Sequence, residues 1–153
     1  IIGSQSDGGA RPGDGFYGET EALVVFDDVF VPNERIFLNG ETEFTETLAD
    51  RFAAFHRQSC SGSKSGIGDV LIGAIALAAQ FNGSDKDSYV RNNLLEMTHL
   101  NETIFSCGVA CSAMAEETEA GGCSIDLPLT NVCRQNVTRF PYEITRLARS
   151  ITR

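Results

Sequence analysis

The chain has 153 residues, a hydrophobic fraction of 42% and a formal net charge of −9 at pH 7. This length is enough for one domain with its own core. The acidic balance argues against nucleic acid or an anionic membrane as a partner, and no run of 18 apolar residues predicts a membrane span. Five cysteines without a regular pairing pattern are typical of reduced thiols in a cytoplasmic protein. Because residue 1 is isoleucine, we expect part of a longer protein.

The first 40 residues predict a loop followed by short strands. Residues 1–20 are rich in glycine and are typical of a linking segment. Residues 23–26 and 29–31 are β-branched or aromatic and predict two strands joined by a turn, with a third short strand at 35–38. Glu21 stands at the start of this run, where a buried carboxylate could act as a base, although most glutamates are solvated.

Helical stretches follow, and they are predicted to pack as an antiparallel bundle. Residues 43–56 repeat apolar side chains every three or four positions. Glycines and serines at 61–68 predict either an interruption of the helix or a close approach by another backbone or a ligand. Residues 70–81 are apolar nearly all round, which predicts burial on most faces. Two longer helices are predicted over 86–117 and 129–151. The first is predicted to carry an apolar stripe of Leu94, Met97, Leu100, Ile104, Cys107 and Cys111. Strands followed by helices give an α+β fold class.

Two features of the longer helices bear on possible sites. Cys107 and Cys111 share a helical face, but two cysteines make only half a metal site, so small core residues are the favoured interpretation. Pro141 is expected to kink the last helix or to start a new one.

The polar chemistry gathers between residues 52 and 69. This stretch holds His56, Arg57, Gln58, Cys60 and Lys64 among small residues, a mixture that a core does not require. A lone histidine beside an apolar stripe is usually a satisfied edge residue, but these neighbours favour a functional role. Cys60 follows His56 by four positions, so both side chains share a helical face.

Four segments together resemble one family. They are EALVVFDDVFVPNERIFL at 21–38, FAAFHRQS at 52–59, the stretch 68–113, and NVCRQNVTRFPYEITRLA at 131–148. The chain is similar to the central part of the 4-hydroxybutyryl-CoA dehydratase and vinylacetyl-CoA Δ-isomerase family, within a group that includes flavin-dependent 4-hydroxyphenylacetate 3-monooxygenases. The resemblance implies an acyl-CoA-dehydrogenase-like fold, in which residues 1–41 end a β-domain and residues 42–153 begin a helical domain.

The same resemblance implies cofactors, partners and site residues. It implies FAD, a [4Fe-4S] cluster, a homotetramer and an acyl-CoA substrate, with water removed from 4-hydroxybutyryl-CoA to give crotonyl-CoA. It assigns His56 as a cluster ligand and base, Glu21 as a carboxylate near the substrate, and Lys64 as a lysine near the cofactors. Arg57 and Gln58 are weaker candidates for contacts with flavin or CoA phosphates.

The sequence departs from the family at a cluster-ligand position and at an active-site position. Ser63 stands where the family has a cysteine ligand of the cluster, and serine is a poor ligand for soft iron–sulfur chemistry. Cys60 stands at the family's active-site tyrosine, and from that position it could reach the same metal as His56. Two alternatives to the dehydratase therefore remain open: a flavin-only relative without the cluster, and a non-catalytic helical assembly module.

Overall fold

The computed structural model describes residues 23–152, and the chain divides into two compact units, residues 1–41 and 42–153. In the described part of the first unit, the regular element is a short 3-10 helix, η1 (Asn33–Arg35). The strands predicted at 23–26, 29–31 and 35–38 are wrong, because these residues adopt no strand. A strand needs a partner to pair its N–H and C=O groups, and among residues 23–152 the only strand pair lies elsewhere.

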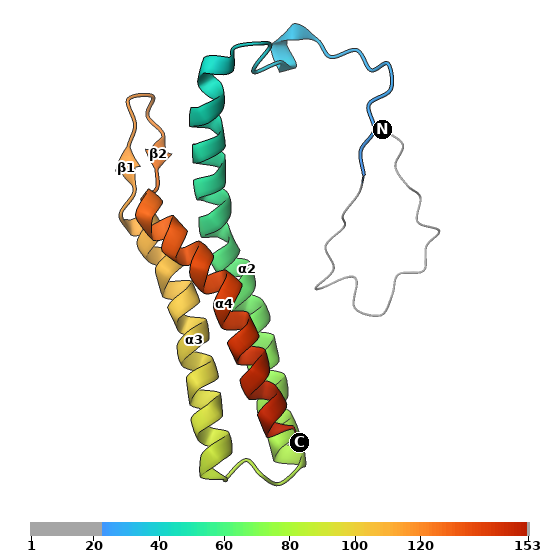
Figure 1. The fold of residues 1–153 in the computed structure, drawn as a ribbon, viewed down its shortest axis with the longest axis vertical. Helices are drawn as coiled ribbons and strands as arrows, with labels where there is room; N and C mark the ends of the chain where they lie inside the picture. The colour runs from blue at the N-terminus through green and yellow to red at the C-terminus, as the bar shows by residue number, and fades with distance from the viewer. Residues whose placement is uncertain (1–22, 153) are drawn as a thin grey trace. The chain divides into compact units, whose positions relative to one another are not determined.

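The second unit is a bundle of three long helices (Figure 1). A 3-10 turn, η2 (Thr42–Phe44), leads into α2 (Thr45–Phe81), which is followed by α3 (Ser88–Ala113) and α4 (Leu127–Ile151). A small antiparallel hairpin of β1 (Glu116–Glu117) and β2 (Cys123–Ser124) connects α3 to α4. Each helix packs against the other two, so the predicted antiparallel bundle is confirmed.

Helix α2 is continuous through the segment that predicted an interruption. Gly62, Gly66 and Gly68 all lie within its 37 residues. Serine hydroxyls of this segment donate to the helix's own carbonyls three residues earlier, as Ser61 does to Gln58 at 2.7 Å. Such bonds weaken a helix only slightly. The packing of α3 and α4 against α2 therefore outweighs the low helix propensity of the glycines.

The core lies where the three helices meet. The apolar stripe predicted for the helix at 86–117 is confirmed on α3, where Met97 and Ile104 are fully buried and Leu100 is 9% exposed. Helix α4 begins at an Asp126 cap, whose carboxylate accepts a hydrogen bond from the Leu129 amide at 2.7 Å. The core members of α4 are Thr130, Cys133, Val137, Ile144, Leu147, Ala148 and Ile151. The helix continues through Pro141, so the prediction of a new helix there is wrong.

Helix α2 is more exposed than its apolar composition predicts. Within residues 70–81 only Ala79 is buried, so the prediction of burial on most faces is wrong. Near the other end of the helix, Phe52 is 70% exposed. By length and composition the segment Thr42–Phe81 could also cross a membrane, with a mean hydropathy of 1.2 over 18 residues, although core helices of soluble proteins meet the same criterion.

Candidate functional site

Four side chains spaced four residues apart form a row along α2: Phe52, His56, Cys60 and Lys64, here called the His56 row. The rings of Phe52 and His56 are stacked, with centroids 6.0 Å apart and planes within 5°. The Cys60 sulfur lies 3.9 Å from Nε2 of His56. His56 and Lys64 are exposed and Cys60 is half-buried. The predicted meeting of His56 and Cys60 on one helical face is therefore confirmed.

The two residues after His56 connect α2 to the other helices. Arg57 donates from Nη1 to Oδ1 of Asn131 on α4 at 2.8 Å. Gln58 donates from Nε2 to the Gly108 carbonyl at 3.3 Å and to the Ser112 hydroxyl at 3.0 Å, both on α3. These bonds hold both side chains within the bundle. Their proposed contacts with flavin or CoA phosphates stay predictions.

Two close contacts between α2 and α3, Ser61 against Gly108 and Gly68 against Asn101, are here called the seam. They set the distance between the two helices. A β-carbon added to Gly108 would lie 1.8 Å from Oγ of Ser61, and one added to Gly68 would lie 2.0 Å from Oδ1 of Asn101. The two contacts are seven residues apart on each helix. Asn101 is 2% exposed and donates to the Ser65 carbonyl at 3.0 Å and to Asp69 Oδ1 at 2.8 Å. The seam therefore fixes the register of α2 against α3.

Four of the five cysteines belong to one cluster between the helices. Cys111 and Cys133 are fully buried, and Cys60 and Cys107 pack against the same cluster. Burial raises the pKa of the Cys133 thiol to about 11, with smaller contributions from the nearby Cys107 and Cys111 thiols. Burial also raises the pKa of Cys111. The Cys111 and Cys133 thiols therefore stay protonated at neutral pH and behave as small apolar residues. The predicted role as a small core residue is confirmed for Cys111, whereas Cys107 is half-buried beside it.

The described residues do not complete an iron–sulfur cluster site. Such a cluster is held by four ligands, and no group of three or more His, Cys, Asp or Glu side chains among residues 23–152 could hold a metal ion. His56 and Cys60 are the nearest pair of candidate ligands. Ser63 is exposed, and its hydroxyl donates to the Cys60 carbonyl at 3.2 Å rather than to any neighbour outside α2.

The predicted roles of Glu21, His56 and Lys64 are all untested. Glu21 lies outside the described residues, so its predicted position in one cavity with His56 is untested. The roles of His56 and Lys64 in catalysis stay predictions. Asn101 and the contacts between α2 and α3 were not predicted from the sequence. An asparagine inside the apolar stripe of a helix was the available signal, because a buried amide must find partners.

The model of the family "4-hydroxyphenylacetate 3-hydroxylase C terminal" matches residues 45–152, which span the bundle. The chain belongs to this family. Two relatives are similar to the chain over more than 80% of its length. The chain is 60% identical over 135 residues to "4-hydroxybutyryl-CoA dehydratase/vinylacetyl-CoA-Delta-isomerase" of Clostridium aminobutyricum, and the match covers 88% of the chain and 28% of that protein.

A solved structure supports the same relationship. It is an oxygen-tolerant archaeal 4-hydroxybutyryl-CoA dehydratase from N. maritimus, with a TM-score of 0.81 and 47% sequence identity. The match covers 84% of the chain and 26% of that structure. The chain thus spans a little over a quarter of the length of either relative. The resemblance inferred from the four sequence segments is confirmed.

Proposed function

We propose that this chain is part of an enzyme that removes water from 4-hydroxybutyryl-CoA to give crotonyl-CoA and that isomerises vinylacetyl-CoA. The observation that carries the proposal is the 60% identity to a protein with both names over 88% of the chain. The His56 row adds a second, local reason, because it presents an imidazole, a thiol and an ammonium group along one face of α2. A buried core would not require that combination.

The proposed cofactor is FAD, bound by the longer protein that includes this chain. When bound, the flavin supplies the oxidation and reduction that a non-acidic C–H bond requires. The chain's own contribution is acid–base chemistry and positioning. His56 has an exposed ring whose orientation is restricted by stacking on Phe52 and by the contact with Cys60. A neutral imidazole so placed can accept a proton from the substrate.

Lys64 extends the same row, and its side chain is exposed. An ammonium group at this position can hold the carbonyl oxygen of a thioester or an anionic part of the cofactor. We further propose that the longer protein has an acyl-CoA-dehydrogenase-like fold, is a homotetramer and is cytoplasmic. Sedimentation of the purified protein tests the tetramer.

The second candidate function is a flavin-only enzyme of the same family. Ser63 favours it, because the described residues offer His56 and Cys60 but no third ligand for a cluster. An anaerobic visible spectrum with iron and sulfide analysis separates the two candidates. About four irons per subunit with flavin would support the dehydratase. Flavin without iron would support the second candidate, and neither cofactor would indicate a non-catalytic assembly module.

Variants refine this test. His56→Ala should abolish turnover of 4-hydroxybutyryl-CoA while leaving flavin content unchanged, if His56 acts as the base. His99→Ala is the matched control, because His99 is exposed on α3 and lies outside the His56 row. Equal activity of the two variants would refute the role of His56. Ser63→Cys should raise the iron content if the longer protein supplies the remaining ligands.

A further inference from the structure

Cys60 carries the thiol of the His56 row, and the proposed function uses this thiol only to restrict the His56 ring. The Cys60 sulfur lies 3.9 Å from Nε2 of His56, and the Cys60 side chain is half-buried. A thiol beside an imidazole is an arrangement of nucleophile and base, because the ring can accept the thiol proton as the sulfur attacks. The pair is therefore suited to form a bond with an electrophile that lies along α2.

The other cysteines lack this arrangement. Cys111 and Cys133 are fully buried, so an electrophile does not reach their sulfur atoms. Cys107 is half-buried, and its thiol donates to a backbone carbonyl of α4 at 3.7 Å. Cys123 is exposed on the hairpin between α3 and α4. Among residues 23–152, Cys60 is thus the cysteine whose sulfur contacts a ring nitrogen.

The neighbours of Cys60 in the row suit one kind of electrophile, an unsaturated thioester. The His56 ring is stacked on Phe52, with centroids 6.0 Å apart, which restricts the direction of its nitrogen atoms. Lys64 is exposed and lies about one helical turn beyond Cys60. When a nucleophile adds to a double bond conjugated with a thioester, negative charge develops on the carbonyl oxygen, and an ammonium group stabilises such a charge. The row thus supplies a nucleophile, a base and a cation for conjugate addition.

We propose that Cys60 adds to C3 of an α,β-unsaturated acyl thioester, here crotonyl-CoA, so that the enzyme is covalently modified by its own product. The choice of crotonyl-CoA rests on the proposed function. The new bond joins the Cys60 sulfur to C3, and the electron pair of the C2–C3 double bond moves to C2. The thiol proton passes to His56 and from there to C2, so the step needs no oxidant, reductant or leaving group. The adduct occupies the row and stops turnover as product accumulates.

The test measures the adduct directly by mass spectrometry. Crotonyl-CoA is added to the purified full-length protein with its cofactors under anaerobic conditions, and the mass of the intact protein is followed over time. Wild type should gain the mass of one crotonyl-CoA, and peptide mapping should place this mass on Cys60. Butyryl-CoA, which lacks the double bond, should form no adduct and should slow the reaction of crotonyl-CoA by competition. Cys60→Ser should not be modified.

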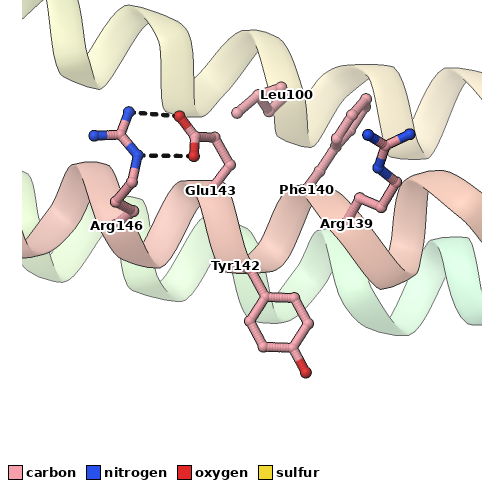
Figure 2. A pocket seen from close by; sticks show the side chains of 6 residues that line it. All are labelled: Leu100, Arg139, Phe140, Tyr142, Glu143 and Arg146. Carbon is pink, nitrogen blue, oxygen red and sulfur yellow. Dashed lines mark hydrogen bonds and ion pairs between the residues drawn. The ribbon is translucent and has the colours of Figure 1, made fainter.

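Two variants serve as matched controls. Cys123→Ser removes the exposed thiol of the hairpin and should be modified like wild type. Arg139→Gln tests whether the modification only follows attraction of an anionic ester to a basic surface. Arg139 lines a hollow between α3 and α4 in which Arg146 is already paired with Glu143 (Figure 2), and no residue of the His56 row lines that hollow. Arg139→Gln should therefore also be modified like wild type.

The His56→Gln variant tests the pairing of thiol and imidazole. Loss of the base should slow adduct formation about a hundredfold. Equal rates in His56→Gln and wild type would overturn the inference, and so would a mass gain that peptide mapping places on Cys123 instead of Cys60. An equal mass gain with butyryl-CoA would overturn the conjugate addition, because this ester has no double bond to attack.

A failure of this inference can be told apart from a failure of the proposed function, because crotonyl-CoA is supplied directly. Turnover of 4-hydroxybutyryl-CoA without any adduct on Cys60 would overturn the inference and leave the function intact. An adduct on Cys60 that depends on His56, without any turnover, would support the inference and refute the dehydratase. Absence of both would overturn both. Circular dichroism of each variant checks that folding is unchanged.

Discussion

Replacing Gly108 by alanine tests the close contact between α2 and α3. An added β-carbon would lie 1.8 Å from Oγ and 2.6 Å from Cβ of Ser61. Rotation of the serine can move Oγ, but Cβ is fixed by the backbone of α2, so the helices must separate. Overpacking costs about 1–3 kcal/mol, and this overlap belongs at the upper end. Alanine returns about 1 kcal/mol of helix propensity, which leaves a net loss of about 2 kcal/mol.

Urea denaturation followed by circular dichroism measures this loss. Gly62→Ala is the matched control, because a β-carbon there meets nothing within 4 Å and should stabilise the protein by about 1 kcal/mol. The double variant Ser61→Gly with Gly108→Ala removes the serine β-carbon, and a double-mutant cycle should then show a favourable coupling. A Gly108→Ala protein as stable as Gly62→Ala would refute the close contact, as would a cycle without coupling.

Three further predictions follow from the cysteines and from the ion pair on α4. At pH 8, iodoacetamide should modify the exposed Cys123 well before the buried Cys111 and Cys133, and mass spectrometry of digests would show the order. Burial in the folded state raises the pKa of Cys133 from 9.0 to about 11. Between pH 9 and pH 11 this thiol is therefore ionised mainly in the unfolded state, so the free energy of unfolding should fall as pH rises through this range. A Cys133→Ala protein with the same alkaline slope in its unfolding free energy would contradict this assignment. Hydrogen bonds from Arg146 lower the pKa of Glu143. The pair should therefore add a little stability above pH 4.5, and this contribution should disappear as pH falls. Thermal melts of Glu143→Gln should lack this pH-dependent contribution.

The helical half of the fold was predictable where one periodicity governs a whole element. Residues of α3 recur at the spacing of a helical face, and Met97 and Ile104 are buried as that spacing predicts. In α2 the same method left two alternatives for residues 61–68, an interruption or a close approach by another backbone or a ligand, and the predicted interruption is wrong because the helix is continuous there. Local propensity disfavours glycine in a helix by about 1 kcal/mol per residue. The free energy gained by packing α2 against α3 and α4 depends on contacts between residues far apart in the sequence, so local propensity does not include it.

The strand predictions failed for a related reason. Residues 23–26 have β-branched and aromatic side chains, but a strand is stable only beside a partner strand. The hairpin that the structure does contain, Glu116–Glu117 with Cys123–Ser124, has few strand-forming residues and fell partly within a predicted helix. Two-residue strands depend on the turn between them. Thr118 supplies it, since its hydroxyl bonds the Gly122 carbonyl at 3.1 Å.

The candidate site shows which parts of a helix-based site a sequence can predict. Four-residue spacing was enough to bring His56 and Cys60 together, because both lie on one helix whose geometry is fixed. Contacts between helices were not predictable, and they changed the interpretation of Arg57 and Gln58. Both residues bond to neighbouring helices rather than standing free beside the His56 row.

The direction in which the His56 row faces therefore depends on the rest of α2. Arg57 holds α2 to α4, Gln58 holds it to α3, and the seam at Ser61 and Asn101 fixes the register on the same side as Gln58. His56 and Lys64 lie on a different face and stay exposed. A substitution in the seam should therefore change both stability and the placement of His56, whereas Gly62→Ala should change stability alone.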